Sequence, residues 1–166
     1  MIDELDKKFR PCVGAMIINS NSKVWLGKRI SKTNYQSENL WQMPQGGIDP
    51  DEDPEKAVLR EVFEETGIKK LKIIAVSAHW YRYKIPKVIL NNMKGDFIGQ
   101  TQKWFLLYYE GDDSEIRLIP DNDSGLYQEF EDWKWENSKN VIDLVINFKK
   151  DTYIKVFKEF TDLGIL

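Results

Sequence analysis

The sequence is poor in cysteine and in long apolar runs. Its 166 residues include a single cysteine, Cys12, which cannot form an internal disulfide and agrees with a reducing compartment; we expect it to be a small core residue. No apolar run approaches the ~20 residues that a membrane-spanning helix needs, and the charged start, MIDELDKKFRP, lacks the apolar region of a signal peptide. We therefore expect a cytoplasmic protein with no membrane partner.

An excess of positive charge is also missing. The formal net charge is -3, whereas nonspecific affinity for nucleic acids comes mainly from basic residues that neutralise phosphates. This argues against a general nucleic-acid coat protein, and we expect no DNA partner, although a local basic site is compatible with the composition. With 42% hydrophobic and 13% aromatic residues, the chain can bury a sizeable core, and we expect residues 1–166 to form one domain.

Runs of β-branched and aromatic residues predict five strands, over residues 13–18, 23–28, 71–83, 103–110 and 130–135. A helix is expected over about residues 145–160. Its apolar stripe, which we assign to core packing, consists of Tyr153, Val156, Phe157 and Phe160. Helices that flank a mixed sheet predict an α/β fold of the α/β/α sandwich type.

A second helix is predicted between residues 53 and 67. Asp53 is a good N-cap, Pro54 suits the first helical position, and Gly67 supplies a C-terminal stop. An apolar stripe that can pack on a sheet is formed by Ala57, Val58 and Val62. On another face lie three carboxylates at positions i, i+3 and i+4, those of Glu61, Glu64 and Glu65.

Carboxylates at this spacing destabilise an isolated helix by roughly 0.2 to 0.5 kcal/mol per pair unless a cation lies among them. A divalent metal ion is the natural candidate, and a solvated acidic face answered by Arg60 and nearby lysines is the alternative. Gly46 and Gly47 precede the helix and let the backbone come close to a ligand near the helix N-terminus. The segment could therefore cradle a metal ion or a phosphate.

Residues 46–68 resemble the Nudix box, whose pattern is Gly, five residues, Glu, seven residues, Arg-Glu, an aliphatic residue, any residue, Glu-Glu, any residue, Gly and an aliphatic residue. Every fixed position matches, namely Gly46, Glu52, Arg60, Glu61, Val62, Glu64, Glu65, Gly67 and Ile68. Asp51 departs from many boxes, which have glycine just before the first glutamate. The resemblance implies the same sandwich fold.

The resemblance extends over most of the chain. The phrases FRPCVGAMIIN, LWQMPQGGID, WYRYKIPK, IGQTQKWFLL, FEDWKW and FKKDTYIKVFKEF are similar to the bacterial branch of RNA pyrophosphohydrolases and dinucleoside polyphosphate hydrolases. Members convert a 5'-triphosphate RNA end to a monophosphate, or split dinucleoside polyphosphates. The loop over residues 31–39 is longer than in the enterobacterial-type RNA enzymes, which leaves both substrate classes open. A catalytically silent module that binds a nucleotide or an RNA end is the alternative from another class.

The resemblance also implies roles for individual residues. It makes Glu61, Glu64 and Glu65 the catalytic ligands of Mg2+, for which Mn2+ is a possible substitute, and includes Gly46 in the metal site. One glutamate also serves as general base, for which we favour Glu61. Arg60 and Glu52 would support the carboxylates, and we expect Glu52 to do so by pairing with Arg60.

Outside the box, the resemblance implies an additional metal ligand at Glu129, with Glu131 and Asp132 as competing choices and a solvated loop acid as the alternative interpretation. It implies a nucleotide-binding cleft lined by Arg29, Tyr83, Gln100, Phe148 and Lys149. A base can stack between an aromatic ring and a guanidinium group while cations meet phosphates. Tyr83 and Phe148 could instead be core residues, and Lys149 a surface charge.

Overall fold

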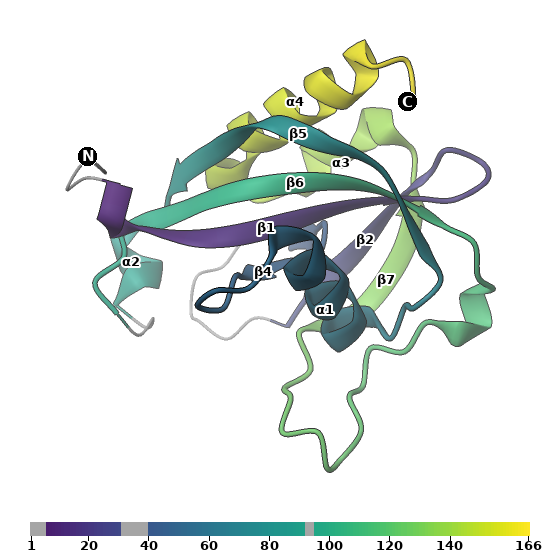
Figure 1. The fold of residues 1–166 in the computed structure, drawn as a ribbon, viewed down its shortest axis with the longest axis horizontal. Coiled ribbons are helices and arrows are strands. Elements are labelled where there is room, and N and C mark those ends of the chain that lie inside the picture. Colours follow the sequence, from purple (N-terminus) through teal and green to yellow (C-terminus); the bar gives the residue numbers. More distant parts are fainter. Residues whose placement is uncertain (1–5, 31–39, 92–94) are drawn as a thin grey trace.

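The computed structural model describes residues 6–30, 40–91 and 95–166. A mixed sheet runs through the middle of the structure (Figure 1), and its strands are β1 (Phe9–Ile18), β2 (Val24–Arg29), β3 (Trp41–Gln42), β4 (Gln45–Gly47), β5 (Leu71–Lys84), β6 (Gly99–Tyr109) and β7 (Phe130–Glu136). The helices are α1 (Pro54–Thr66), α2 (Lys87–Leu90), α3 (Ser138–Leu144) and α4 (Asn147–Asp162), with short 3-10 helices η1 (Asp6–Lys8) and η2 (Asp113–Glu115).

The strand order is β3-β2-β1-β6-β5, and β4 and β7 pair with β1 and β2 respectively. Strands β1 and β6 are parallel along their whole length, from Phe9 opposite Gly99 to Ile18 opposite Tyr108, while the other pairs are antiparallel. The sheet is therefore mixed, as predicted.

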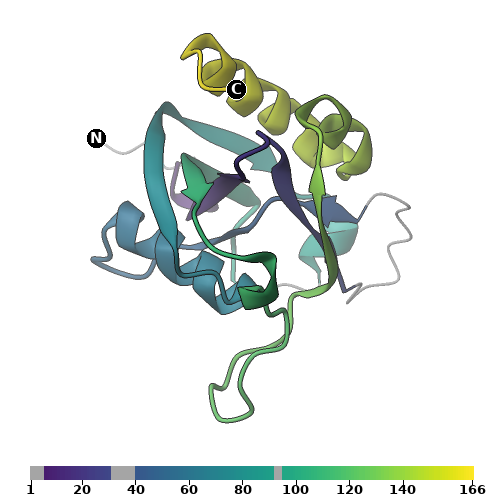
Figure 2. The same ribbon diagram turned by 90° about the vertical axis from the view of Figure 1, so that its right-hand side faces the viewer.

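Side chains alternate across β1 and so divide the interior into two cores. Val13, Ala15 and Ile17 pack with α1, whereas Met16 and Ile18 pack with α3 and α4. Figure 2 shows α3 and α4 on one side of the sheet and α1 on the other. The predicted α/β/α sandwich is confirmed.

All five predicted strands are present, with shifts at their ends. The main differences are β1, which begins at Phe9, and β6, which begins at Gly99. The short strands β3 and β4 and the helices α2 and α3 were not predicted, because two to seven residues carry too little periodicity. The expected loop over residues 31–39 lies outside the described residues.

The predicted C-terminal helix begins later than expected. Val145 and Ile146 are extended and separate α3 from α4, so the helix expected from residue 145 starts at Asn147. Its stripe does pack in the core: Tyr153, Val156 and Phe160 are buried and Phe157 is partly buried against them.

Cys12 is fully buried, as expected. Among the described residues, no helix is both long and apolar enough to cross a membrane. The cytoplasmic location and the single domain over residues 1–166 stay predictions.

Candidate active site

The caps of α1 form as the sequence predicts. The Asp53 carboxylate accepts hydrogen bonds from the backbone N–H groups of Glu55 (2.9 Å) and Lys56 (3.4 Å), and Pro54 is the first helical residue. At the other end, Gly67 adopts the left-handed conformation (φ 71°) that favours glycine. Ala57, Val58 and Val62 are buried against the sheet, which fixes the rotation of the helix and thus the direction of its glutamates.

Arg60 is the centre of a charged network between α1 and the preceding loop. Its guanidinium donates to both carboxylate oxygens of Glu52, at 2.8 and 2.7 Å, and to the carbonyl oxygen of Gly47 at 3.0 Å. It also donates to Glu61 at 2.9 Å and to Glu64 at 3.3 Å. The hydrogen bonds from Arg60 lower the pKa of Glu52 to about 2. The expected pairing of Arg60 with Glu52 is therefore confirmed.

The loop before the box helix contains a strained position. Asp51 has a positive φ of 62°, in the left-handed region that glycine occupies at low cost and that aspartate tolerates better than most residues. This explains why many boxes carry glycine at this point. The next residue, Glu52, accepts a hydrogen bond from the backbone N–H of Asp49 at 3.0 Å, so the turn presents Glu52 to Arg60.

Gly46 and Gly47 in β4 lie against charged side chains. A Cβ atom on Gly46 would stand 2.0 Å from the carboxylate of Glu61, and a Cβ atom on Gly47 would stand 2.2 Å from the guanidinium of Arg10. Such contacts are impossible for a real side chain, so glycine is required at Gly46 if Glu61 is to keep its place. The backbone of β4 thus forms part of the wall beside Glu61.

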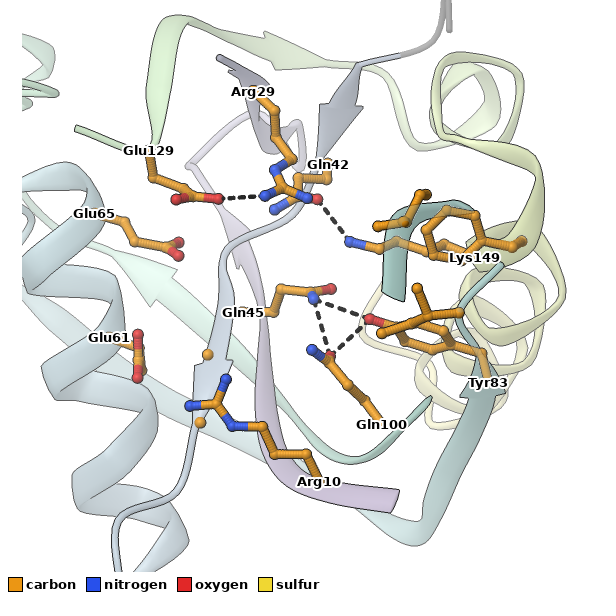
Figure 3. A pocket seen from close by; sticks show the side chains of 15 residues that line it. Arg10, Arg29, Gln42, Gln45, Glu61, Glu65, Tyr83, Gln100, Glu129 and Lys149 are labelled. Carbon is orange, nitrogen blue, oxygen red and sulfur yellow. Dashed lines mark hydrogen bonds and ion pairs between the residues drawn. The ribbon is translucent and has the colours of Figure 1, made fainter. Parts of the chain in front are cut away.

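One cavity of about 400 Å³ brings together most of the predicted site residues (Figure 3). Those that line it are Arg29, Gly46, Glu61, Glu65, Tyr83, Gln100, Glu129, Phe148 and Lys149. Glu64 is not among the lining residues and is held by Arg60. The cavity lies between α1 on one side and the start of α4 on the other, with β4 between them.

The α1 side of the cavity is acidic. Burial is the main cause that raises the pKa of Glu61, and it raises the pKa of Glu65 well above its usual value with a further contribution from the charge of Glu129. The Oε2 atom of Glu65 is buried and accepts no hydrogen bond from the described residues. These carboxylates need a cation to keep their charge in this environment.

Glu129 reaches the cavity, while its two competitors do not line it. Glu129 forms an ion pair with Arg29 at 2.8 Å. Glu131 is exposed and pairs with Lys28 at 2.7 Å, and the exposed Asp132 accepts a hydrogen bond from the backbone N–H of Trp133. Among these three acids, position in the structure therefore favours Glu129.

The opposite side of the cavity is cationic and aromatic. Lys149 is buried, which contradicts the alternative that it is a surface charge, and its Nζ atom donates to Gln42 Oε1 at 2.7 Å. Burial, followed by the charge of Arg29, lowers the pKa of Lys149 to about 7. The rings of Tyr83 and Phe148 lie 5.7 Å apart at 45°. Tyr83 is buried and Phe148 is half-buried, and both line the cavity.

Gly47, which precedes the helix together with Gly46, also lines the cavity. Five further lining residues were not singled out in the sequence: Arg10, Gln42, Gln45, Ile85 and Ile89. Two of these five, Gln42 and Gln45, stand in the phrase LWQMPQGGID, shortly before the box helix. Their position in the sequence could have indicated that they line the site, because the chain passes the cavity in β4 before it reaches α1. Arg10 could be placed only once β1 was known to begin at Phe9.

The residues present suit a divalent metal ion that prefers oxygen ligands. Glu61, Glu65 and Glu129 line one cavity, and Glu65 Oε2 is a buried acceptor to which no described residue donates. Within residues 6–30, 40–91 and 95–166, no three acidic, histidine or cysteine side chains are already gathered as a complete metal site. One reason is that the guanidinium of Arg60 already forms ion pairs with the carboxylates of Glu61 and Glu64.

Known proteins are similar to this chain in sequence and in fold. The NUDIX domain family matches residues 8–157. A protein of Agrobacterium fabrum named RNA pyrophosphohydrolase is 40% identical, over 96% of this chain and 95% of its own length, and one of Afipia carboxidovorans with the same name is 42% identical, over 94% of each chain.

Among solved structures, the E. coli dihydroneopterin triphosphate pyrophosphohydrolase has a TM-score of 0.65 at 18% identity, covering 90% of this chain and 96% of its own. A C. elegans Ap4A hydrolase has a TM-score of 0.58 at 20% identity, covering 91% and 98%. At these identities the two structures support the fold alone. The match over residues 8–157, together with relatives at 40% identity or more over nearly the whole chain, shows that the chain belongs to the Nudix family.

Proposed function

We propose that this Nudix chain is a pyrophosphohydrolase that acts on 5'-triphosphate RNA ends, releasing pyrophosphate and leaving a 5'-monophosphate, on dinucleoside polyphosphates such as diadenosine tetraphosphate and pentaphosphate, or on both. The observation that carries this proposal is the cavity, in which the carboxylates of α1 face a cationic and aromatic wall. The names of the relatives at 40% and 42% identity support the RNA reaction.

The α4 side of the cavity has the groups that a nucleotide needs. A base can stack on the rings of Tyr83 and Phe148, at roughly 1 to 3 kcal/mol per base. Arg29 and Lys149 can bind the phosphates, and the negative charge of the polyphosphate favours the protonated form of Lys149. These contacts direct the phosphoanhydride toward the carboxylates of α1.

Glu61, Glu64 and Glu65 of α1, together with Glu129 and Gly46, are the proposed metal site, and Mg2+ is the proposed metal, with Mn2+ as a substitute. When bound, such an ion neutralises phosphate charge and makes a water molecule easier to deprotonate. Glu61 is the proposed base that accepts the proton of the attacking water, because burial raises its pKa toward the range useful for general-base catalysis.

Arg60 and Glu52 act on this site without touching the substrate. By holding Glu61 and Glu64 with one guanidinium, Arg60 limits the directions in which the two carboxylates can point. A catalytically silent module is not favoured, because every carboxylate of the Nudix box is present.

The test compares kcat/KM on a short 5'-triphosphate RNA, diadenosine tetraphosphate and diadenosine pentaphosphate, each with Mg2+ and with EDTA. Faster turnover of RNA would assign the chain to RNA 5'-end processing, and faster turnover of the dinucleotides to nucleotide clearance. Absence of metal-dependent turnover with all three substrates would overturn the proposal and favour the silent module.

A further inference from the structure

A line of polar side chains runs from the core to the cavity on one face of the sheet. Gln100, Gln102 and Trp104 alternate along β6 and therefore share a face. Tyr83 of β5 lies opposite Gln100, and Gln45 of β4 reaches the same face, since both Gln45 and Trp104 are register partners of Gly14. Three of these five residues, Gln45, Tyr83 and Gln100, line the cavity.

The inner end of this line has a fixed hydrogen-bond direction. The indole N–H of the fully buried Trp104 donates to Gln102 Oε1 at 3.1 Å, and an indole can only donate. The amide oxygen of Gln102 must therefore face Trp104. Its Nε2 group then points the other way and donates to Gln100 Oε1 at 3.1 Å.

The orientation of the Gln102 amide in turn determines the orientation of the polar groups that line the cavity. Because the oxygen of Gln100 faces inward, it accepts from the hydroxyl of Tyr83 at 2.7 Å and from Gln45 Nε2 at 3.2 Å. Gln45 Nε2 also donates to the Tyr83 hydroxyl at 3.1 Å. Both contacts use the nitrogen of the Gln45 amide (Figure 3). The indole of Trp104 therefore determines which end of Gln45 remains available.

The remaining end of the Gln45 amide is an acceptor that has no donor in the described part of the chain. Its Oε1 atom is buried, and none of the described residues donates to it. A rotation of the amide would place two acceptors against each other at Gln100, so the protein cannot satisfy this atom by turning the side chain. A buried acceptor of this kind is costly unless a donor reaches it. The same cavity contains Tyr83 and Phe148, on which a base can stack.

We propose that Gln45 Oε1 accepts a hydrogen bond from the exocyclic amino group of a substrate base, such as adenine or cytosine, and that Trp104, Gln102 and Gln100 position it for this role. The inference rests on the proposed nucleotide substrate and adds a preference among bases. An amino group meets Gln45 Oε1 as a donor, whereas the exocyclic carbonyl of uracil or hypoxanthine would meet it as a second acceptor. Gln45 is thus a specificity residue, and Gln102 is a positioning residue.

The experiment uses substrates that differ in the group at position 6 of the purine ring. We would measure kcat/KM for 5'-triphosphate dinucleotides that carry adenine, unsubstituted purine or hypoxanthine at both positions, so that the position of the recognised base need not be known. We expect adenine to be preferred over purine by about 10-fold or more, because the site leaves its acceptor unpaired with the analogue. Hypoxanthine should be no better than purine.

Two variants and a control test the series of hydrogen bonds that runs from Trp104 to Gln45. Gln45→Met removes the acceptor, and Gln102→Met removes the donor that orients Gln100, so both should bring the ratio of adenine to purine close to one. Thr101→Val, on the opposite face of β6, should keep the wild-type ratio. A ratio near one in the wild-type protein, or a ratio unchanged by Gln45→Met, would overturn the inference.

A failure of the proposed hydrolase function can be distinguished from a failure of this inference. If no substrate is turned over with Mg2+, the base preference can still be measured by calorimetry, as the Kd of ATP against purine riboside triphosphate in EDTA. A tighter Kd for ATP that Gln45→Met abolishes would support the inference even then, and equal Kd values would overturn it.

Discussion

Arg60 binds Glu52 through two parallel hydrogen bonds, at 2.8 Å from Nε and 2.7 Å from Nη2. The remaining guanidinium donors reach the backbone of β4 and the carboxylates of Glu61 and Glu64. One planar group therefore ties the loop before α1, the strand beside the cavity and two box glutamates together. Charge-assisted pairs of this geometry are stronger and more directional than single hydrogen bonds.

Replacing Glu52 should loosen this arrangement. In Glu52→Gln the bidentate acceptor is lost, and we expect kcat/KM to fall by about 10- to 100-fold, as is typical for residues that orient metal ligands. Glu55→Gln, in the exposed first turn of α1, is the control and should behave as the wild-type protein. A variant as active as the wild type would show that Arg60 orients the carboxylates without Glu52.

Replacing Glu65 should lower the activity of the protein without lowering its stability. The Oε2 atom of Glu65 is buried, and burial is the main cause that raises the pKa of this carboxylate, so Glu65→Gln should leave the Tm equal or higher while metal-dependent turnover falls by at least about 100-fold. Circular dichroism and a metal titration would follow both properties. Metal-dependent turnover at the wild-type rate in Glu65→Gln would refute its assignment as a metal ligand.

Glu129 and Glu131 provide a matched pair of acids two residues apart. Glu129→Gln should weaken the apparent affinity for Mg2+ by about 10-fold or more, because Glu129 lines the cavity. Glu131→Gln should change it little, since Glu131 is exposed and paired with Lys28 at the surface. The measurement is the Mg2+ dependence of kcat/KM, and equal effects of the two changes would contradict the assignment.

Lys149 should make polyphosphate binding dependent on pH. With a pKa of about 7, its amine is largely neutral in the free protein above that pH, whereas a bound polyphosphate favours the ammonium form. Binding should therefore take up a proton above pH 7, and affinity should fall as the pH rises. The groups that act on Lys149 are Arg29, Glu129, Glu65 and Cys12.

Calorimetry with a non-hydrolysable triphosphate, in EDTA and in buffers of different ionisation enthalpy, would measure this proton uptake. Lys149→Met distinguishes Lys149 from the neighbouring acids, because only the contribution of the amine is lost. Proton uptake that persists in Lys149→Met would assign it to another group.

Phe148 should distinguish the two substrate classes. Its ring faces Tyr83, and Phe148→Ala should lower kcat/KM on 5'-triphosphate RNA by roughly 5- to 150-fold, which corresponds to the loss of one base stack of about 1 to 3 kcal/mol. Ile154→Ala, at an exposed position of α4, is the control. If the chain serves mainly dinucleoside polyphosphates, its rate should instead depend on the length of the polyphosphate.

Local patterns predicted the parts of the fold that depend on neighbours in sequence. The caps at Asp53 and Gly67 and the buried stripe of α1 required only helical spacing, and the structure has all of them. The break at Val145 and Ile146 could not be predicted in this way, because apolar residues continue across it and the separation of α3 from α4 depends on packing against the sheet.

The site shows the same division. The resemblance to the Nudix box singled out Glu61 and Glu65, which line the cavity. Helical spacing alone could not show that Glu64 does not line the cavity and pairs with Arg60 instead. The role of Gln45 could not be predicted from the sequence, because it depends on contacts with Gln100 and Tyr83, which lie in strands far away along the chain. Orientation of an amide is a property of the assembled sheet.

The parallel pairing of β1 with β6 joins segments from opposite halves of the chain, with Phe9 opposite Gly99. Contacts of this range form slowly compared with helices, and during synthesis the N-terminal part must wait for its partner. Lys149, which completes the cavity, leaves the ribosome later still. A chain that has made only the box helix therefore has its acidic residues but no place to hold a nucleotide, so hydrolytic capacity should arise late in biogenesis.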